Sequence, residues 1–299
     1  SFFEYFIESE GPYDYVLNLS ALKHVRSEKD IFSLMRLIQV NILNTISSIK
    51  ILSSRDTKKY FCVSTDKAAN PVNMMGASKK IMEAFLKSLS EKINISSARF
   101  ANVAFSDGSL LYGFEKRFNL GQPISIPNDV QRYFVTPQES GELCLMSSIF
   151  GENNDIFFPK TNKNFELTYF KPILKRYLKA KGFDIYYCHS EEEARSCAKE
   201  IIKNKQWPVF EFESDTTGEK HFEEFYEDKE KCNLSRFSSI GIVSNSQKLS
   251  KNKLNYFMQE INSFLEQKSW EKTDLVDLFE NTLHDFNHIE EGKNLDEKM

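Results

Sequence analysis

The chain has 299 residues, a formal net charge of −4 and 40% hydrophobic residues, a composition typical of a globular protein and not of a disordered one. It has no basic block and no apolar run of about 18 residues, so neither nucleic acid nor a membrane is expected as a partner. No signal peptide is visible, and the five cysteines are scattered without a CxxC pair. This cysteine usage predicts reduced thiols in a cytoplasmic protein.

Strands and helices alternate in the first third of the sequence. Short apolar runs at 13–21, 58–66 and 94–105 predict buried strands of a parallel sheet. Apolar residues at helical spacing predict helices over 30–52 and 73–92, between these strands. This alternation is typical of a parallel α/β sheet with right-handed crossover connections.

The pattern changes after Phe105. Residues 106–140 contain turns, a short helix and short strands, which predict a smaller α+β portion beyond the sheet. The rest of the chain is richer in charged and aromatic residues. Three further helices are expected there, over 190–205, 252–267 and 273–286.

Polar or small residues stand where each of the three predicted strands should stop. They lie in "NLSALKHV" (18–25), "STDK" (64–67) and "RFANVAFSDGS" (99–109). Open parallel sheets bind their ligands beyond the carboxyl ends of the strands, so we expect a binding site at this edge. The histidines show no metal-ligand spacing with acids or cysteines, and no metal site is expected.

Four ordered blocks carry a family resemblance. They are "LSALKHV" (19–25), "VSTDKAANPVNMMGASKKIMEAF" (63–85), "RFANVAFSDGSLLYGFEKR" (99–117) and "RYFVTPQES" (132–140). In this order and at this spacing, the chain resembles the extended short-chain dehydrogenase/reductase superfamily. Within it, the chain is similar to the polysaccharide-biosynthesis branch of UDP-N-acetylglucosamine 4,6-dehydratases and related nucleotide-sugar epimerases. The later segment "SEEEAR" (190–195) also resembles longer members that make nonulosonic acid precursors.

The resemblance implies a UDP- or GDP-linked N-acetylglucosamine as substrate and a tightly bound NAD or NADP as cofactor. The cofactor takes a hydride from C4 of the sugar, water leaves across C5–C6, and the hydride returns to C6. The product is a 4-keto-6-deoxy sugar nucleotide. Such a site needs a proton acceptor at O4, a base at C5, an acid at O6 and a cation near the cofactor ribose. A homo-oligomer formed through long helices, including those over 73–92 and 30–50, is also implied.

Catalytic roles fall on five residues by this resemblance. Lys79 matches the lysine of the YxxxK motif and would bind the nicotinamide ribose, while Met75 stands at the tyrosine position. Asp66 would protonate the leaving O6, and Lys67 would take the C5 proton if its surroundings lower its pKa. Because a methionine cannot exchange a proton, O4 would be deprotonated by Asp66 or by Thr65 through water.

The binding roles follow from the same resemblance. The cofactor would contact residues at the ends of two strands, namely Asn18, Ser20, Ala21, Ser64 and Lys79. The nucleotide sugar would contact Lys23 and His24 near the sugar, and Asn102, Ser106, Gly108, Ser109 and Arg132 around the nucleotide and its diphosphate.

A Gly-rich phosphate-binding turn is missing from the sequence. The eleven glycines form neither GxGxxG nor GxxGxxG, and the first predicted strand matches the fourth strand of the family sheet. We therefore expect a chain that lacks the N-terminal strands of the family, exposes one edge of its sheet and binds NAD(P) weakly or not at all.

The expected fold class is α/β, with a partial Rossmann-type doubly wound parallel sheet, a smaller α+β substrate-binding portion and a helical C-terminal extension. We place the half of the NAD(P)-binding domain at 1–105, the substrate-binding portion at 106–180 and the extension at 181–299. The favoured function is a nucleotide-sugar 4,6-dehydratase in surface polysaccharide or nonulosonic acid biosynthesis. Two alternatives stay open: a 5-epimerase of the same branch, and a truncated nucleotide-sugar binder without activity.

Overall fold

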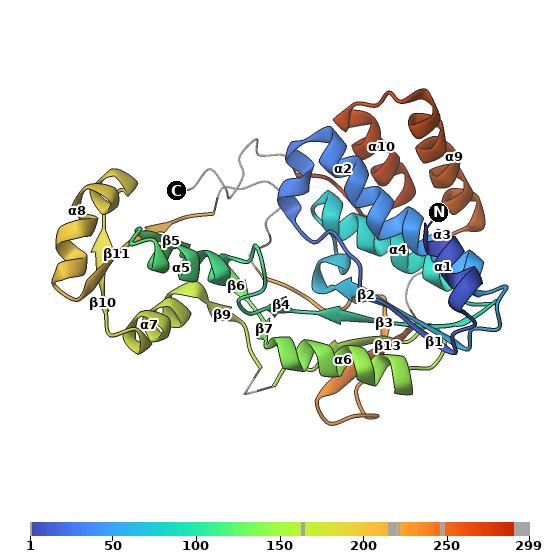
Figure 1. Cartoon of the computed structure of the whole chain (residues 1–299), viewed down its shortest axis with the longest axis horizontal. Helices are drawn as coiled ribbons and strands as arrows, with labels where there is room; N and C mark the ends of the chain where they lie inside the picture. The colour runs from blue at the N-terminus through green and yellow to red at the C-terminus, as the bar shows by residue number, and fades with distance from the viewer. Residues whose placement is uncertain (1, 163–164, 215–219, 221, 246–248, 290–299) are drawn as a thin grey trace. The chain divides into compact units, whose positions relative to one another are not determined.

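The structure of the chain is a computed structural model that describes residues 2–162, 165–214, 220, 222–245 and 249–289. The chain divides into two compact units, each assembled from separate segments (Figure 1). Unit 1 contains Ser1–Phe100, Gln138–Lys160 and Glu224–Ile289. The described part of unit 2 lies in Ala101–Pro137 and Thr161–Glu223.

A mixed sheet forms the centre of unit 1. In spatial order, its described strands are β1 (Tyr15–Asn18), β2 (Lys59–Thr65), β3 (Asn94–Phe100), β8 (Ile156–Pro159), β13 (Ile240–Asn245) and β12 (Lys231–Asn233). The strands from β1 to β8 are parallel to one another, and β13 and β12 add an antiparallel edge. The α/β fold with a mostly parallel sheet, predicted from the alternation of strands and helices, is confirmed.

Helices cover both faces of this sheet (Figure 1). One face carries α1 (Phe2–Glu10), α2 (Ile31–Ile38), α3 (Asn44–Leu52), α4 (Met74–Leu89), α9 (Lys251–Gln267) and α10 (Lys272–Thr282). The other face carries α6 (Pro137–Phe150). Short turns of other helix types are η1 (Val25–Lys29), the π-helical η2 (Gln39–Leu43) and η3 (Asp66–Ala68). The helix predicted over 30–52 is therefore interrupted by a π-helical turn.

The two faces of β2 are buried in different cores. Tyr60 and Cys62 face the large core beneath α4, while Phe61 and Val63 face the smaller core beneath α6. This double burial explains why β2 reads as a continuous apolar run and not as an alternating one. On the outer side of α4, Phe257 of α9 packs against Phe85, with 6.1 Å between ring centroids.

Strand β1 forms an edge of the sheet. It pairs with β2 and with no other described strand, and its Tyr15 and Leu17 side chains are 57% and 38% exposed. Leu19, just beyond the strand, is 58% exposed. The exposed edge expected from the sequence is present in the structure, with apolar side chains along it.

Unit 2 has its own small parallel sheet, with the strand order β10-β11-β5. Its strands and helices are β5 (Ile124–Pro127), β10 (Asp184–Cys188), β11 (Gln206–Phe212), α5 (Leu110–Asn119), α7 (Phe170–Ala180) and α8 (Glu191–Lys203). Two short pairs are formed by β4 (Asn102–Val103) with β7 (Phe134–Val135), and by β6 (Gln131–Arg132) with β9 (Thr168–Tyr169). Phe118 stacks on Trp207 in the core of this unit, with 4.4 Å between ring centroids.

The C-terminal part of the chain is not purely helical, in contrast to the sequence-based expectation. Strands β10 and β11 lie in unit 2, and β12 and β13 lie in unit 1. The segment "QWPVFEF" that forms β11 alternates its side chains between two packed faces, a strand pattern that the surrounding charged residues obscure.

A buried arginine connects three segments of unit 1. Arg99 of β3 is 1% exposed and donates two hydrogen bonds to the Glu83 carboxylate, at 2.9 and 2.7 Å. It donates two more to Glu230, at 2.7 and 2.9 Å, and one to the carbonyl oxygen of Phe225. Burial alone would lower the pKa of Arg99, but the charges and hydrogen bonds of Glu83 and Glu230 raise it, so the guanidinium stays charged.

We expect Arg99→Met to lower the free energy of unfolding by about 3–5 kcal/mol, because it leaves two carboxylates buried without their cation. Urea denaturation measures this loss. The matched control is Arg55→Met, since Arg55 pairs with Glu8 at an exposed site and its loss should cost under about 1 kcal/mol. Equal losses in the two variants would contradict the assignment of Arg99 as an anchor.

Candidate functional site

A buried acid and a partly exposed amine lie side by side at the carboxyl end of β2. Asp66 and Lys67 begin η3, and the Lys67 ammonium is 3.2 Å from Oδ1 of Asp66. The same oxygen accepts hydrogen bonds from the Thr65 hydroxyl, at 2.8 Å, and from the Lys67 backbone N–H, at 2.9 Å. The Asp66 side chain is 1% exposed and that of Lys67 is 21% exposed. The carboxylate is thus held in one orientation, while the amine remains accessible from outside.

The first turn of α4 lies directly against this segment. Asn73 caps the helix by accepting a hydrogen bond from the Gly76 N–H, at 2.8 Å. A Cβ atom at Gly76 would collide with the carbonyl oxygen of Lys67, so only glycine permits this close approach. The sequence therefore fixes the start of α4, with Met75, next to the Asp66–Lys67 pair.

Met75 and Lys79 lie about one helical turn apart on the buried side of α4, and they are 2% and 3% exposed. The Lys79 ammonium donates a hydrogen bond to the carbonyl oxygen of Val63, at 3.0 Å, and lies 3.7 Å from the Met82 sulfur. Burial lowers the pKa of Lys79, while Cys62 and Glu83 oppose this shift. Lys79 thus contacts the backbone of β2 near its carboxyl end. Its contact with a cofactor ribose stays a prediction.

The turn after β1 contains a second polar group. The Asn18 amide donates to the Tyr60 hydroxyl, at 2.8 Å, and its oxygen accepts from the Ser20 N–H, at 3.1 Å, and from the Ser20 hydroxyl, at 2.5 Å. Ala21 and His24 are partly exposed in the same turn, and Lys23 is exposed. Asn18 therefore shapes the turn, and Ser20, Lys23 and His24 are the side chains that remain accessible from it.

Ser64 has a different environment from the one expected. Its hydroxyl donates to Oε1 of Glu83, at 2.6 Å, and the residue is 3% exposed. This oxygen also accepts from Arg99. Ser64 therefore belongs to the ion cluster beneath α4 in this structure, and its proposed contact with the cofactor would need this hydrogen bond to break.

Asn41 is a buried residue next to the candidate site that the sequence analysis missed. It is fully buried in the π-helical turn η2, and its amide accepts from the Leu22 N–H and donates to the Leu22 carbonyl, both at 2.9 Å. It also donates to the Ser78 hydroxyl, at 3.0 Å. Asn41 therefore joins the turn after β1 to α4. In the structure, the π-helical turn draws attention to Asn41, because such turns recur at functional sites. In the sequence, no residue pattern predicts a π-helical turn, so Asn41 could not be found there.

Glu28 is a second residue that the sequence analysis missed. Its Oε1 accepts from the backbone N–H groups of Met74 and Met75, at 2.8 and 3.4 Å, and its Oε2 lies 2.7 Å from Nε2 of His288. Glu28 is 3% exposed. A carboxylate stabilises the positive N-terminal end of a helix, so Glu28 holds the turn that contains Met75.

The predicted contacts for the nucleotide lie in unit 2. Asn102 donates to the carbonyl oxygen of Tyr133, at 3.3 Å. Ser106 and Gly108 form the turn before α5, where Gly108 has a φ of 67°, and the Ser109 hydroxyl caps α5 by accepting from the Tyr112 N–H, at 3.2 Å. The exposed turn at the start of a helix is a suitable place for anion recognition, which stays a prediction here.

Arg132 has protein partners in the same unit. Its Nε lies 3.3 Å from Oε1 of Glu223, and its Nη1 donates to the carbonyl oxygen of Lys220, at 2.8 Å. The residue is 6% exposed. A diphosphate would have to compete with Glu223 for this guanidinium, and the contact stays a prediction.

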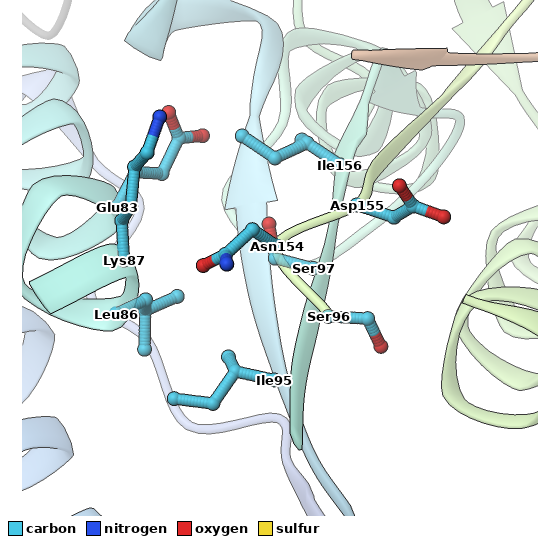
Figure 2. A pocket seen from close by; sticks show the side chains of 9 residues that line it. All are labelled: Glu83, Leu86, Lys87, Ile95, Ser96, Ser97, Asn154, Asp155 and Ile156. Atoms are coloured by element: carbon cyan, nitrogen blue, oxygen red, sulfur yellow. The ribbon is translucent and has the colours of Figure 1, made fainter. Parts of the chain in front are cut away.

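The predicted residues thus fall into two groups, one in each unit. Within unit 1, hydrogen bonds join Thr65, Asp66 and Lys67 and join Asn18 to Ser20. A separate pocket lies at the amino-terminal half of β3, between α4 and the start of β8 (Figure 2). Glu83 and Lys87 approach it from α4, and Asn154 and Asp155 from the opposite side. No residue predicted for the site lines this pocket, and it lies at the wrong end of the strands for a ligand of a parallel sheet.

Two further observations apply to the described part of the chain alone. Within it, no group of three or more histidine, cysteine, aspartate or glutamate residues is placed to hold a metal ion. None of its helices combines the length and apolarity needed to cross a bilayer.

The sequence matches one family and several curated proteins. The profile of the polysaccharide biosynthesis protein family matches residues 4–245. The capsular polysaccharide biosynthesis protein CapD of Staphylococcus aureus is 34% identical over 124 residues, which are 40% of this chain and 21% of CapD. A UDP-glucose 4-epimerase of Rickettsia canadensis is 31% identical over 155 residues, which are 50% of this chain and 45% of the epimerase. The chain thus spans less than half the length of these relatives.

Solved structures share the fold. Pen from Bacillus thuringiensis superposes with a TM-score of 0.65 at 20% identity, covering 89% of this chain and 79% of Pen. The dTDP-glucose 4,6-dehydratase DesIV of Streptomyces venezuelae, solved with NAD bound, superposes with a TM-score of 0.55 at 12% identity, covering 87% of this chain and 76% of DesIV. At such identities the likeness establishes the fold.

The lowered pKa of Lys79 predicts a pH dependence of stability. Its pKa is below 10.5 in the folded chain, so the unfolded chain binds more protons between the two values, and stability rises with pH there. We expect wild type to gain stability relative to Lys79→Met as the pH rises towards 10.5. Urea unfolding of both proteins at several pH values measures this, and a difference independent of pH would contradict it. All other titratable groups are present in both proteins, so their contributions to the pH dependence of the free energy of unfolding largely cancel.

Proposed function

Because the chain belongs to the polysaccharide biosynthesis protein family, we propose that it acts in the conversion of a nucleotide sugar, as the catalytic part of a 4,6-dehydratase. One observation carries the proposal: a buried carboxylate and an accessible amine lie 3.2 Å apart at the carboxyl end of a central parallel strand. Elimination of water across C5–C6 needs such a pair, because a proton must leave C5 and another must reach O6.

The geometry supports a short proton path. In the reactive form of the pair, Lys67 is a neutral amine and Asp66 a carboxylic acid, which requires the ammonium proton of the ion pair to move across the hydrogen bond to Asp66. The Lys67 amine, the more exposed of the two groups, then takes the proton from C5, and the Asp66 carboxylic acid delivers its proton to the leaving O6. Since their reacting atoms are within hydrogen-bond distance, the proton received by Lys67 can pass to Asp66, and the pair returns to its starting state after each turnover. The hydroxyl of Thr65, hydrogen-bonded to Asp66, extends the path towards O4.

Met75 takes no part in the proton transfers of this proposal. It cannot exchange a proton, and it is buried in the first turn of α4, which Glu28 holds through the backbone N–H groups. The methionine therefore leaves the proton transfers to Thr65, Asp66 and Lys67. Lys79, four residues later, supplies positive charge next to the end of β2.

The residues present fit one half of a dinucleotide. Ser20 is exposed beyond β1, and Lys79 places its ammonium at the end of β2, where a nicotinamide ribose would be held. When bound, the cofactor accepts the C4 hydride and returns it to C6. The sequence contains no Gly-rich turn for the pyrophosphate, so the fit is partial.

The activity is tested with the polypeptide that the gene encodes, incubated with UDP- or GDP-N-acetylglucosamine and NAD or NADP. We expect a 4-keto-6-deoxy product by NMR, and losses of about 10²-fold or more in kcat for Asp66→Asn and Lys67→Met. Lys50→Met, at an exposed position of α3, is the control. A ring epimer without loss of water would favour the 5-epimerase. Binding without turnover would favour the non-catalytic binder, and full activity of both variants would refute the assigned pair.

The partial fit predicts weak cofactor binding by the 299-residue chain. Without a pyrophosphate cradle, we expect a dissociation constant for NAD or NADP on the order of 1 mM or weaker. Isothermal titration calorimetry measures it. Tight binding would show that residues other than a Gly-rich turn hold the pyrophosphate in this chain.

A further inference from the structure

Two cysteines that are nine positions apart in the sequence meet in unit 2. Cys188 is the last residue of β10, and Cys197 lies in the second turn of α8. Their sulfur atoms are 3.9 Å apart. Helix α8 is held against β10 and β11 by the buried side chains of Ala194 and Ala198, so the meeting of the two thiols is a product of packing and not of a CxxC motif.

From this geometry we propose that Cys188 and Cys197 form a dithiol site that is oxidised to a disulfide by a small-molecule disulfide such as glutathione disulfide. A disulfide needs about 2.05 Å between the sulfurs, so the atoms must approach by roughly 2 Å. A change in side-chain torsion angles at the partly exposed Cys197 can supply this approach. This modification is independent of the proposed nucleotide-sugar chemistry.

The two thiols differ in environment, which sets the order of the steps. Cys188 is buried, and desolvation together with the neighbouring Cys197 raises its pKa to about 12. Cys197 is partly exposed, so an oxidant reaches it first. The Cys197 thiolate attacks one sulfur of glutathione disulfide, and a glutathione thiolate leaves. The Cys188 thiolate then attacks Sγ of Cys197, and the second glutathione leaves.

The reaction balances in atoms and in electrons. Two protein thiols lose two protons and two electrons and become one disulfide, while one glutathione disulfide becomes two glutathione molecules. The product joins the end of β10 to α8 through a short closed loop. Such a crosslink restricts the unfolded chain and should raise the melting temperature of the oxidised protein by several degrees.

The test is oxidation of the purified chain at graded ratios of glutathione disulfide to glutathione. We expect peptide mapping by mass spectrometry to find Cys188 linked to Cys197, with three thiols left for titration out of five. In Cys188→Ser, glutathione should remain attached to Cys197, because the resolving thiol is gone. The matched control is Cys232→Ser, which removes another partly exposed cysteine and should leave the crosslink unchanged.

Three outcomes would overturn the proposal. The wild-type protein could keep all five thiols when the glutathione pool is fully oxidised. It could retain glutathione on Cys197 without forming the crosslink, which would show that the sulfurs cannot approach. Finally, Cys188→Ser could release glutathione from Cys197 and lose two thiols as the wild type does, which would assign the resolving role to another cysteine.

Discussion

The guanidinium of Arg99 is the interaction on which unit 1 depends. Arg99 lies in β3 and uses all five of its N–H donors inside the protein, and its partners come from α4 and from the segment after residue 223. Glu83 and Glu230 could not be buried without this cation, and Arg99 could not be buried without both carboxylates. The three segments therefore have to assemble together, because each buried charge is compensated only in the complete cluster.

The same acidic segment reaches the candidate site. Glu227 accepts from the Asn70 N–H, at 3.1 Å, and from the Lys80 ammonium, while Glu224 accepts from the Asn70 amide, at 3.0 Å. Asn70 follows η3 and has a φ of 44°, a left-handed conformation that asparagine tolerates better than most residues. A segment more than 150 residues away in sequence thus fixes the loop that joins the Asp66–Lys67 pair to α4. Glu28 accepts from the Met74 N–H and Asn41 donates to Ser78, so α4 beside the candidate site is also restrained by residues outside the Asp66–Lys67 pair.

The sequence predicts the elements of unit 1 well where hydrophobic periodicity decides them. Strand β2 and helix α4 agree with the predicted ranges to within one to three residues, because their buried faces are continuous and their ends are marked by Asp66 and Asn73. The roles of Arg99 and Asn41 were not predictable, because their partners are distant in sequence and only the fold brings them together. Ser64 is a different case: its position at a strand end suggested a ligand contact, which stays a prediction, while in the structure its hydroxyl donates to Glu83.

The packing of α4 also limits how the chain can associate with a second copy. Twelve of its sixteen residues are buried, since α9 and α10 cover the side that the sheet, α2 and α3 leave open. Phe257 of α9 contacts both Phe85 of α4 and Phe279 of α10, so displacing this pair of helices would expose Phe85. A homo-oligomer that used residues 73–92, as the family resemblance implies, would therefore have to displace two helices of its own chain. Exposed apolar side chains of unit 1 include Tyr15 and Leu17 on β1 and Phe32 at the start of α2, and others lie on α1 and α6. Self-association through these residues would leave the Arg99 cluster and the α4 packing undisturbed.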